Sequence, residues 1–334
     1  MLKKIIKWTI LGGALALLAA CGSNDQNTRL RISVIPKATS HEFWQSVHAG
    51  AIRAGKELDV EVVWIGPEKE DDRQQQIALI DNQVMNQVDG IVLAPLDKVA
   101  VLRPVKNAVT KNVPVIIYDS NLEGSEDIRT SFVATNNREG GRIAGEQLGN
   151  MLNGSGKVVL LRYLEGSAST TNREAGFLEA LQKFPDIELV SDEQYAGVTV
   201  ASAQQASENL LLRFTGPDGK LTIDGIFCPN ESSTYGMLQA LRRQRLGGTV
   251  TFVGFDASES LIEGLESRDI SGLVVQNPFK MGYIGVKTMV QHLKGEPVEK
   301  IIDTGVAFVT PENMNEPAMQ ELIKPDLDKW LNMQ

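Results

Sequence analysis

The chain of 334 residues has very few of the side chains that form disulfides or bind zinc. Its only cysteines are Cys21 and Cys228, which excludes both a disulfide framework and a cysteine-ligated zinc site. Its three histidines, His41, His48 and His292, form no His-x-x-x-His pair, so a histidine zinc site is not expected either. We therefore predict a protein without a metal or a cofactor.

Positive charge is also scarce. The chain has 33 lysines and arginines against 42 aspartates and glutamates, a net charge of -9 at pH 7. Binding to nucleic acid requires a basic face, so this class of partner is excluded. With 42% hydrophobic and 22% charged residues, the chain can bury a sizeable core. At roughly 150 residues per domain, its length indicates two domains.

The apolar run from Trp8 to Ala20 is too short to span a bilayer of about 30 Å. It follows three lysines, so residues 1–20 are typical of a secretory signal peptide. The sequence Leu-Ala-Ala-Cys at 18–21 resembles the bacterial lipobox, which implies acylation of Cys21 and a lipidated tether over 21–28. We expect the protein outside the cytoplasm, lipid-anchored to a bacterial membrane in the periplasm or on the outer face of the cell. The alternative is an ordinary signal with an incidental cysteine.

Short β-branched runs alternate with segments of helical spacing through the rest of the chain. The predicted strands are 31–35, 60–65, 90–93, 113–118, 131–134, 157–161, 187–190, 224–228, 249–255, 272–276 and 306–309. The predicted helices are 42–58, 74–88, 139–152, 172–184, 201–214, 233–244 and 281–293. Strands separated by helices of this length indicate βαβ units, and hence an α/β protein with parallel sheets.

A weak internal repeat divides the chain into two similar halves. Residues 88–95 resemble residues 223–230, and residues 113–119 parallel residues 250–256 at nearly the same offset. The second pair ends in Asp119 and Asp256. Ligands of open parallel sheets bind beyond the carboxyl ends of the strands, so two facing lobes would bring both aspartates into one cleft. Chance similarity between buried strands is the alternative.

The order and spacing of segments 40–44, 89–95, 253–256 and 275–278 resemble sugar-binding proteins of ATP-driven importers. The similar group is the ribose-binding-protein-like one, with the type I periplasmic-binding-protein fold. The resemblance implies two open, Rossmann-like parallel-sheet lobes joined by a three-strand hinge. It places residues 29–134 and 277–304 in the N-terminal lobe, and residues 135–276 and 305–334 in the C-terminal lobe.

The resemblance also implies a function. A solute-binding lipoprotein of this kind captures a monosaccharide between its lobes and delivers it, as a monomer, to an ABC permease and its ATPase. A sensor role beside a chemoreceptor or sensor kinase is one alternative. An enzyme that converts sugars is another, although the sequence shows no convincing general base. A repressor of related fold is excluded, because a signal peptide stands where a helix-turn-helix would begin.

Three candidate ligand residues follow the first strand. Phe43 and Trp44 match the family's stacking aromatics, and an aromatic ring suits the apolar C–H face of a sugar. His41 stands where the family often has asparagine, and its imidazole can donate to or accept from a hydroxyl. The alternatives are a core position for Phe43 and a surface loop for His41.

Five polar candidates lie further along the chain. Asp119 and Asp256 can each accept two hydroxyl protons from a diol, and the alternative for them is helix capping. Arg173, at the start of a predicted helix, matches the family's sugar-binding arginine, unless it is a solvated helix charge. Asn230 and Gln276 end strands at matching positions, and their amides both donate and accept.

The sequence departs from the family at two points. The ribose-type pattern often has Asp-Arg after the fourth strand, whereas this chain has Asp119-Ser120, which weakens the case for strict ribose specificity. A second stacking aromatic is not evident, since Tyr195 lies near the expected place and not on it. The segment 137–142 could bind an anion at a helix start, but its Gly140-Gly141 pair favours a helix that packs closely through glycine.

Overall fold

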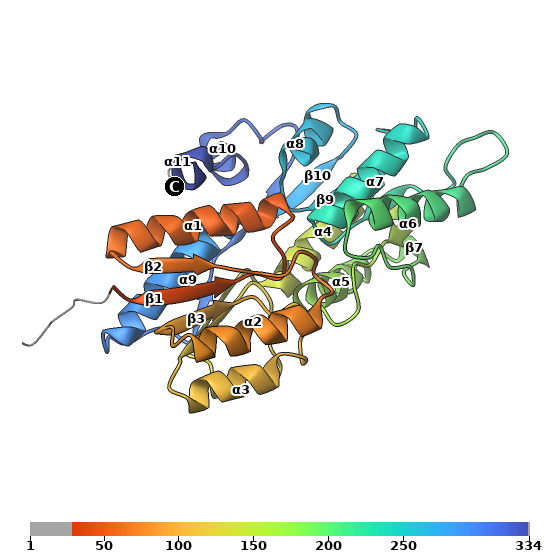
Figure 1. The fold of residues 1–334 in the computed structure, drawn as a ribbon. Coiled ribbons are helices and arrows are strands. Elements are labelled where there is room, and N and C mark those ends of the chain that lie inside the picture. Colours follow the sequence, from red (N-terminus) through yellow and green to blue (C-terminus); the bar gives the residue numbers. More distant parts are fainter. Residues whose placement is uncertain (1–28, 333–334) are drawn as a thin grey trace, which may run out of the picture.

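The computed structural model describes residues 29–332. The predicted signal peptide over 1–20, the predicted lipidation of Cys21 and the predicted tether over 21–28 lie outside these residues. Figure 1 shows two groups of elements side by side, one with α1, α2, α3 and α9 and the other with α4 to α8. Each group surrounds one six-stranded sheet.

The first sheet is entirely parallel, in the order β11-β5-β4-β3-β1-β2. Its strands are β1 (Arg31–Ile35), β2 (Glu61–Trp64), β3 (Gly90–Leu93), β4 (Val115–Tyr118), β5 (Ser131–Ala134) and β11 (Ile301–Asp303). Its helices are α1 (Glu42–Leu58), α2 (Arg73–Met85), α3 (Leu102–Thr110) and α9 (Pro278–Leu293). Alternate residues of β4 enter two cores, Ile116 and Tyr118 beside α1 and α9, and Val115 and Ile117 beside α2 and α3. A strand buried on both faces explains the continuous apolar run.

The second sheet has the order β12-β10-β9-β8-β6-β7. Its strands are β6 (Ser155–Leu160), β7 (Asp186–Ser191), β8 (Gly225–Phe227), β9 (Thr251–Phe255), β10 (Gly272–Gln276) and β12 (Val306–Val309). Its helices are α4 (Asn137–Met151), α5 (Ala168–Leu181), α6 (Val200–Arg213), α7 (Glu231–Arg243) and α8 (Glu259–Glu266). This sheet is parallel except at one edge, where β12 pairs antiparallel with β10.

The chain passes between the two sheets three times. It does so after β5, after β10, and between β11 and β12. The first and third passages are in contact. The Thr135 hydroxyl lies 3.2 Å from the Thr304 hydroxyl and donates to the carbonyl of Gly305 at 3.0 Å. Three adjacent strand connections give the lobes a common axis about which they can rotate.

The C-terminal segment crosses from one lobe to the other. Helix α10 (Pro317–Ile323) contacts β10, whereas α11 (Asp328–Leu331) packs on α1 of the first lobe. The guanidinium carbon of Arg53 lies 5.7 Å from the centre of the Trp330 ring. Figure 1 shows α10 and α11 above α1, close to the C-terminus. The predicted assignment of residues 305–334 to the second lobe remains a prediction.

All eleven predicted strands and seven predicted helices are present, with ends that differ by a few residues. The predictions omitted β11, α3, α8, α10 and α11. These elements are short, between three and nine residues, so they contain too few turns or alternations to show a period. Helix α5 begins at Ala168 and not near Asn172, which places Arg173 in its second turn.

Candidate functional site

The repeat places two aspartates at equivalent strand ends. Asp119 follows β4 with φ 61° and Asp256 follows β9 with φ 71°, both in the left-handed region. Each donates its backbone N–H to the adjacent strand, Asp119 to the carbonyl of Val133 at 3.0 Å and Asp256 to that of Val274 at 2.8 Å. This conformation is uncommon outside glycine but is accessible to aspartate. The chain thus turns in the same way in both lobes and directs both carboxylates toward the cavity between the sheets.

This central cavity has a volume of only about 30 Å³. All eight predicted ligand residues line it: His41, Phe43, Trp44, Asp119, Arg173, Asn230, Asp256 and Gln276. Space of this size holds about two water molecules, so entry of a larger ligand requires the lobes to separate. Residues from both sheets enclose the cavity, and the lobes are therefore in a closed arrangement.

Asp256 is the centre of a buried polar network. Its Oδ1 accepts from the amide of Gln276 at 2.7 Å, and its Oδ2 accepts from the backbone N–H of Glu231 at 3.0 Å. The guanidinium of Arg173 lies 3.8 Å from the same Oδ2 and 3.9 Å from the centre of the Phe255 ring. Burial raises the pKa of Asp256, against the opposing effect of Arg173. The network holds a planar donor, a carboxylate and an amide within reach of one ligand.

Asp119 pairs with a lysine that the sequence reasoning did not identify. Its Oδ2 lies 2.7 Å from Lys37 Nζ, and both side chains are almost fully buried. Lys37 follows β1 and also donates to Ser169 Oγ of the other lobe at 2.9 Å. Ser120 carries no charge and instead accepts from the backbone N–H of Ser169 at 3.1 Å. Lys37 therefore supplies, from a different strand, a cation beside Asp119.

A second network surrounds Glu70, in the segment between β2 and α2. Its carboxylate accepts from Trp44 Nε1 at 2.8 Å and from the Tyr163 hydroxyl at 3.0 Å, and His41 Nδ1 lies 3.4 Å away. Burial alone would lower the pKa of His41, but the bond to Glu70 and its charge, with Glu231 and Asp256, raise it to about 9. The hydrogen bond and charge of His41, the charge of Lys37 and the bond from Trp44 outweigh burial and hold the pKa of Glu70 at about 2. His41 is thus an imidazolium at neutral pH and can only donate.

The aromatic side chains are arranged differently from expectation. Phe43 and Trp44 both line the cavity and contact each other edge to face, with ring centres 4.8 Å apart. Trp44 is 2% exposed and also touches Tyr118 edge on. Tyr195 is 47% exposed and lines a different, outer pocket, so it is not a stacking partner here. Tyr163, at the end of β6, is the aromatic that lines the cavity from the second lobe.

Asn230 serves first as a helix cap. Its Oδ1 accepts from the backbone N–H of Ser233 at 3.3 Å, and its Nδ2 donates to Ser232 Oγ at 3.1 Å. The reciprocal bond from Asn230 N–H to Ser233 Oγ completes a capping box for α7. The capping alternative raised for the aspartates therefore applies to Asn230, although its side chain also lines the cavity.

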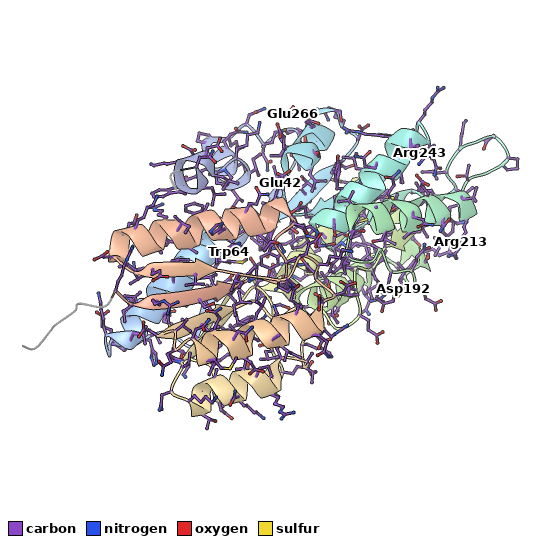
Figure 2. All side chains as sticks on the ribbon, viewed as in Figure 1. Glu42, Trp64, Asp192, Arg213, Arg243 and Glu266 are labelled. Atoms are coloured by element: carbon purple, nitrogen blue, oxygen red, sulfur yellow. The ribbon has the colours of Figure 1, made fainter. Side chains whose placement is uncertain are left out.

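Two carboxylates bind helix N-termini of the opposite lobe. Glu231, in the first turn of α7, accepts from the backbone N–H of Phe43 in α1 at 2.9 Å. Glu42, in the first turn of α1, accepts from the backbone N–H of Glu259 in α8 at 3.0 Å. Figure 2 shows Glu42 at the end of α1 that faces α8. The first N–H groups of a helix have no partner within it and favour an anion, so both contacts stabilise the closed arrangement.

Six cavity residues were missed by the sequence reasoning. They are Lys37, Glu70, Tyr163, Ser169, Thr170 and Glu231. Lys37, Glu70 and Tyr163 follow the carboxyl ends of β1, β2 and β6, so the rule that identified Asp119 and Asp256 could have found them. Nothing in their local sequence distinguishes them from solvated loop residues.

We expect the stability of the protein to fall between pH 6.5 and pH 9 because of His41. The folded protein holds this proton more tightly than the unfolded chain, since its pKa rises from 6.5 to about 9. The stabilisation is complete below pH 6.5 and is lost as the pH rises through 9, with a total of about 3 kcal/mol. Chemical denaturation of the wild type and of His41→Gln at several pH values measures the difference between them.

His48→Gln is the matched control for this pH dependence. Burial lowers the pKa of His48 to about 4, so this residue stays neutral throughout the window. Its variant should retain the slope of the wild type between pH 6.5 and pH 9. An unchanged slope in His41→Gln would contradict the charged state assigned to His41.

Removal of the Glu42 carboxylate should open the lobes. In Glu42→Ala the N-terminus of α8 loses its anion, at a cost of about 1 kcal/mol to the closed form. The population of open molecules should then rise about fivefold. Small-angle scattering should give a larger radius of gyration for this variant than for Glu68→Ala, a control at an exposed loop position. Equal radii would show that the contact does not influence closure.

The site can therefore bind a small polyhydroxylated molecule with one apolar face. It offers carboxylates and amides as acceptors, a guanidinium and an ammonium as donors, and aromatic rings from both lobes. Within residues 29–332 no cluster of side chains has the composition of a metal site. In the same residues, no helix combines the length and apolar character needed to cross a membrane.

Comparison with known proteins decides the family. The family model described as a periplasmic binding protein domain matches residues 32–297. The chain belongs to the periplasmic binding protein family. The predicted family and the two-lobed α/β fold are thereby confirmed. The roles of the individual site residues and the lobe boundaries remain predictions.

Three relatives show what this family member is similar to. A D-ribose/D-allose-binding protein of Pseudomonas aeruginosa is 27% identical over 322 residues, 89% of this chain and 96% of the relative. A carbohydrate transporter solute-binding protein of Agrobacterium radiobacter, solved with D-arabinose, is 35% identical with a TM-score of 0.83, covering 89% of this chain and 99% of that one. An Agrobacterium vitis solute-binding protein with bound D-fucose is 31% identical with the same TM-score, covering 88% and 99%.

Proposed function

We propose that this member of the periplasmic binding protein family captures a monosaccharide between its lobes and delivers it to the permease of an ABC importer. The supporting observation is the convergence of eight candidate ligand residues, from both lobes, on one closed cavity. The sugars in the names of the relatives are ribose, allose, arabinose and fucose, which have the hydroxyl pattern such a cavity suits. Lipidation of Cys21 would keep the monomeric protein at the membrane that holds the permease and ATPase.

In the proposed mechanism, the lobes 29–134 plus 277–304 and 135–276 plus 305–334 rotate about the three connections. The open form exposes Phe43 and Trp44 for stacking and the polar groups for hydroxyl binding. A sugar that contacts both lobes favours closure, because it binds the closed form better than the open one. The Glu42 and Glu231 contacts then hold the closed form that docks on the permease.

We further propose that the sugar leaves chemically unchanged. In the cavity, Asp119 is paired with Lys37 and Glu70 with His41. Glu231, whose pKa burial raises to about 7, accepts from the backbone N–H of Phe43. These pairings suit them to hydrogen bonding, since a general base needs a pKa near the working pH and access to a substrate proton. Sugar recovered after overnight incubation should therefore be identical to the input by mass spectrometry and NMR.

A thermal-shift screen of the full-length protein tests the proposal. The panel contains D-ribose, D-allose, D-arabinose, D-fucose and xylitol, with citrate and leucine as controls that are not sugars. A ligand at 1,000 times its dissociation constant adds about 4 kcal/mol of apparent stability, which raises Tm by several degrees. We expect at least one sugar to do so. A shift with leucine or citrate alone would contradict the assignment to sugars.

A further inference from the structure

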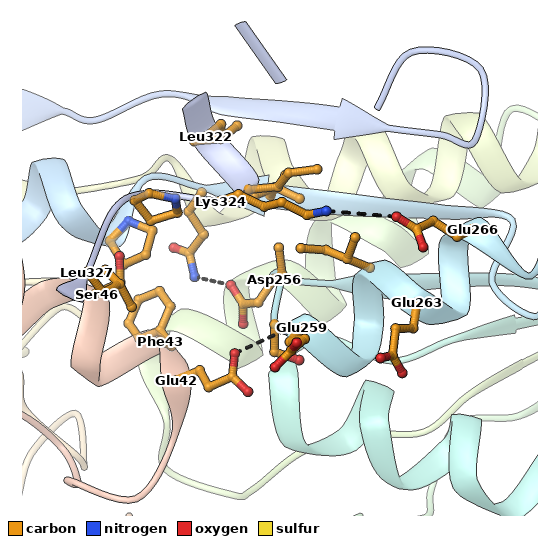
Figure 3. A pocket seen from close by; sticks show the side chains of 18 residues that line it. Glu42, Phe43, Ser46, Asp256, Glu259, Glu263, Glu266, Leu322, Lys324 and Leu327 are labelled. Atoms are coloured by element: carbon orange, nitrogen blue, oxygen red, sulfur yellow. Dashed lines mark hydrogen bonds and ion pairs between the residues drawn. The ribbon is translucent and has the colours of Figure 1, made fainter. Parts of the chain in front are cut away.

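A second and larger cavity lies next to the ligand cavity. It has a volume of about 480 Å³ and is enclosed by α1, α8 and the C-terminal segment 322–327. Figure 3 shows it with Glu42, Phe43, Ser46 and Leu327 on one side, Glu259, Glu263 and Glu266 on the other, and Leu322 and Lys324 above. We call this space the vestibule. Its volume is typical of a small-molecule site.

The vestibule adjoins the ligand cavity. Phe43, Asp256 and Gln276 line both spaces, so a ligand held by these three side chains can extend from one into the other. The central cavity alone is far smaller than the vestibule. A substituent on the sugar can therefore be accommodated here without further separation of the lobes.

Two buried polar atoms in the vestibule lining lack a partner. Ser46 is 5% exposed and Gln276 is 2% exposed, and neither Ser46 Oγ nor Gln276 Oε1 makes a hydrogen bond within the described residues. Buried polar atoms are normally paired, and an unpaired one costs about 1–3 kcal/mol. Both atoms can accept a hydrogen bond, so a ligand group that carries N–H donors would satisfy them.

The charges around the vestibule are mostly negative. Its rim carries four carboxylates, Glu42, Glu259, Glu263 and Glu266, against a single cation, Lys324, which lies 3.8 Å from Glu266. The side chains of Glu259 and Glu263 form no ion pair within the described residues. Such a rim attracts cations and repels anions, and the effect decreases with salt.

We infer that the ligand site extends into the vestibule and that the vestibule accepts an amine-bearing substituent of the sugar while rejecting phosphate or carboxylate. The ammonium donates to Ser46 Oγ and Gln276 Oε1 and is attracted by the four carboxylates. An anion would meet the unpaired amide oxygen of Gln276 and the like charge of the four carboxylates, which selects against it. This inference deepens the proposed sugar-binding function and rests on it for the identity of the ring.

The charge selectivity can be measured without a sugar. Leu322→Cys places a thiol in the vestibule lining, in a Cys21→Ser background where the remaining cysteine, Cys228, is buried. Its reaction rates with a trimethylammonium-ethyl and a sulfonato-ethyl thiosulfonate are compared with those of Leu212→Cys, which is exposed on α6. At low salt the cation-to-anion rate ratio should be about tenfold higher at position 322.

Variants of the rim identify the source of the selectivity. In Glu259→Gln/Glu263→Gln the rate ratio should fall toward that of Leu212→Cys. In the control Glu188→Gln/Glu193→Gln, which removes two exposed carboxylates near β7, the ratio should stay unchanged. Equal ratios at the two thiols, or a ratio unaffected by the rim variant, would overturn the inference.

Calorimetry then tests binding with defined sugars. The probes are D-ribose and D-allose, each compared with derivatives that carry an amine or a phosphate at the terminal carbon. We expect the amine to bind about tenfold more tightly than the phosphate, and the rim variant to reduce this difference while the parent sugar binds as before. A tighter phosphate would overturn the inference. Failure of both parent sugars would count against the sugar assignment, while the thiol rates still decide the charge selectivity of the vestibule.

Discussion

Replacement of Asp256 by asparagine should weaken sugar binding roughly 5- to 150-fold, a loss of about 1–3 kcal/mol. The carboxylate accepts from Gln276 and from the N–H of Glu231, and it lies 3.8 Å from Arg173. The asparagine amide has a single acceptor oxygen, so its NH₂ group would face one of these donors. The variant would therefore lose an acceptor for the sugar hydroxyls, and the neighbouring donors would lose the carboxylate that orients them. Isothermal titration calorimetry with the sugar found by thermal shift gives the value.

The same substitution should also lower the free energy of unfolding. Arg173 is 2% exposed and would lose its nearest counter-charge in the second lobe. Removal of one partner of a buried ion pair costs 3–5 kcal/mol in general. Arg173 keeps its hydrogen bonds to Asn137 Oδ1 and to the Pro229 carbonyl. We therefore expect the free energy of unfolding, measured with denaturant, to fall by about 3 kcal/mol, the lower end of this range.

Asp186→Asn is the matched control, because Asp186 is exposed at the start of β7 and has no ion pair within the described residues. It should leave affinity and stability as in the wild type. Wild-type affinity in Asp256→Asn would remove this residue from the ligand site. Reduced affinity with unchanged stability would show that Arg173 does not depend on Asp256 for its burial.

The second large effect is expected for Gly141→Ala. Helices α4 and α5 pack closely, and a Cβ at position 141 would lie 1.8 Å from the carbonyl oxygen of Arg173. The clash is with backbone, so α5 has to shift as a whole. Overpacking of this kind costs about 3 kcal/mol, more than the roughly 1 kcal/mol that alanine gains over glycine in a helix.

Because the displaced residue is Arg173, sugar affinity should fall along with stability. A shift of the guanidinium from Asp256 and the ligand that costs about 1.4 kcal/mol would reduce affinity tenfold. Thermal unfolding and calorimetry on the same preparation measure both effects. The inference fails if the variant binds sugar as the wild type does.

Gly264→Ala provides a control within a helix. An added Cβ there meets methyl groups of Ile270 and Leu238 at 2.9 Å, and these side chains can adjust where backbone cannot. We expect a small change in stability and none in sugar affinity. If Gly264→Ala and Gly141→Ala were equally damaging, close contact with backbone would not be the cause.

The sequence by itself determined the architecture. Alternation of β-branched runs with helical stripes predicted the strand and helix order, because each period reports which faces of an element are buried. The repeat placed Asp119 and Asp256 at equivalent strand ends, and the topology of parallel sheets brought both to one cavity. The Gly140-Gly141 pair also predicted a helix that packs closely through glycine, in preference to an anion site. The close approach of Gly141 in α4 to the backbone of Arg173 in α5 agrees with that prediction.

Only the tertiary structure decided how the site is assembled. Lys37 and Asp119 follow different strands, and Glu70 meets Tyr163 across the two lobes. Nothing local to either partner encodes such pairs, because they arise from the packing of segments distant in the chain. The side chain of Asn230 fits both a cap and a ligand contact in sequence, and only the observed bonds to Ser232 and Ser233 show the cap.

The packing of distant segments also decides which tyrosine, Tyr163 or Tyr195, lines the ligand cavity. Both follow strands of the second lobe and both have aromatic rings, so sequence position could not rank them. In the folded chain Tyr163, beyond the end of β6, has 1% of its surface exposed, whereas Tyr195, beyond the end of β7, has 47% exposed. Periodicity in a sequence reports burial along one element, whereas a binding site depends on the distance between elements, which only the folded chain determines.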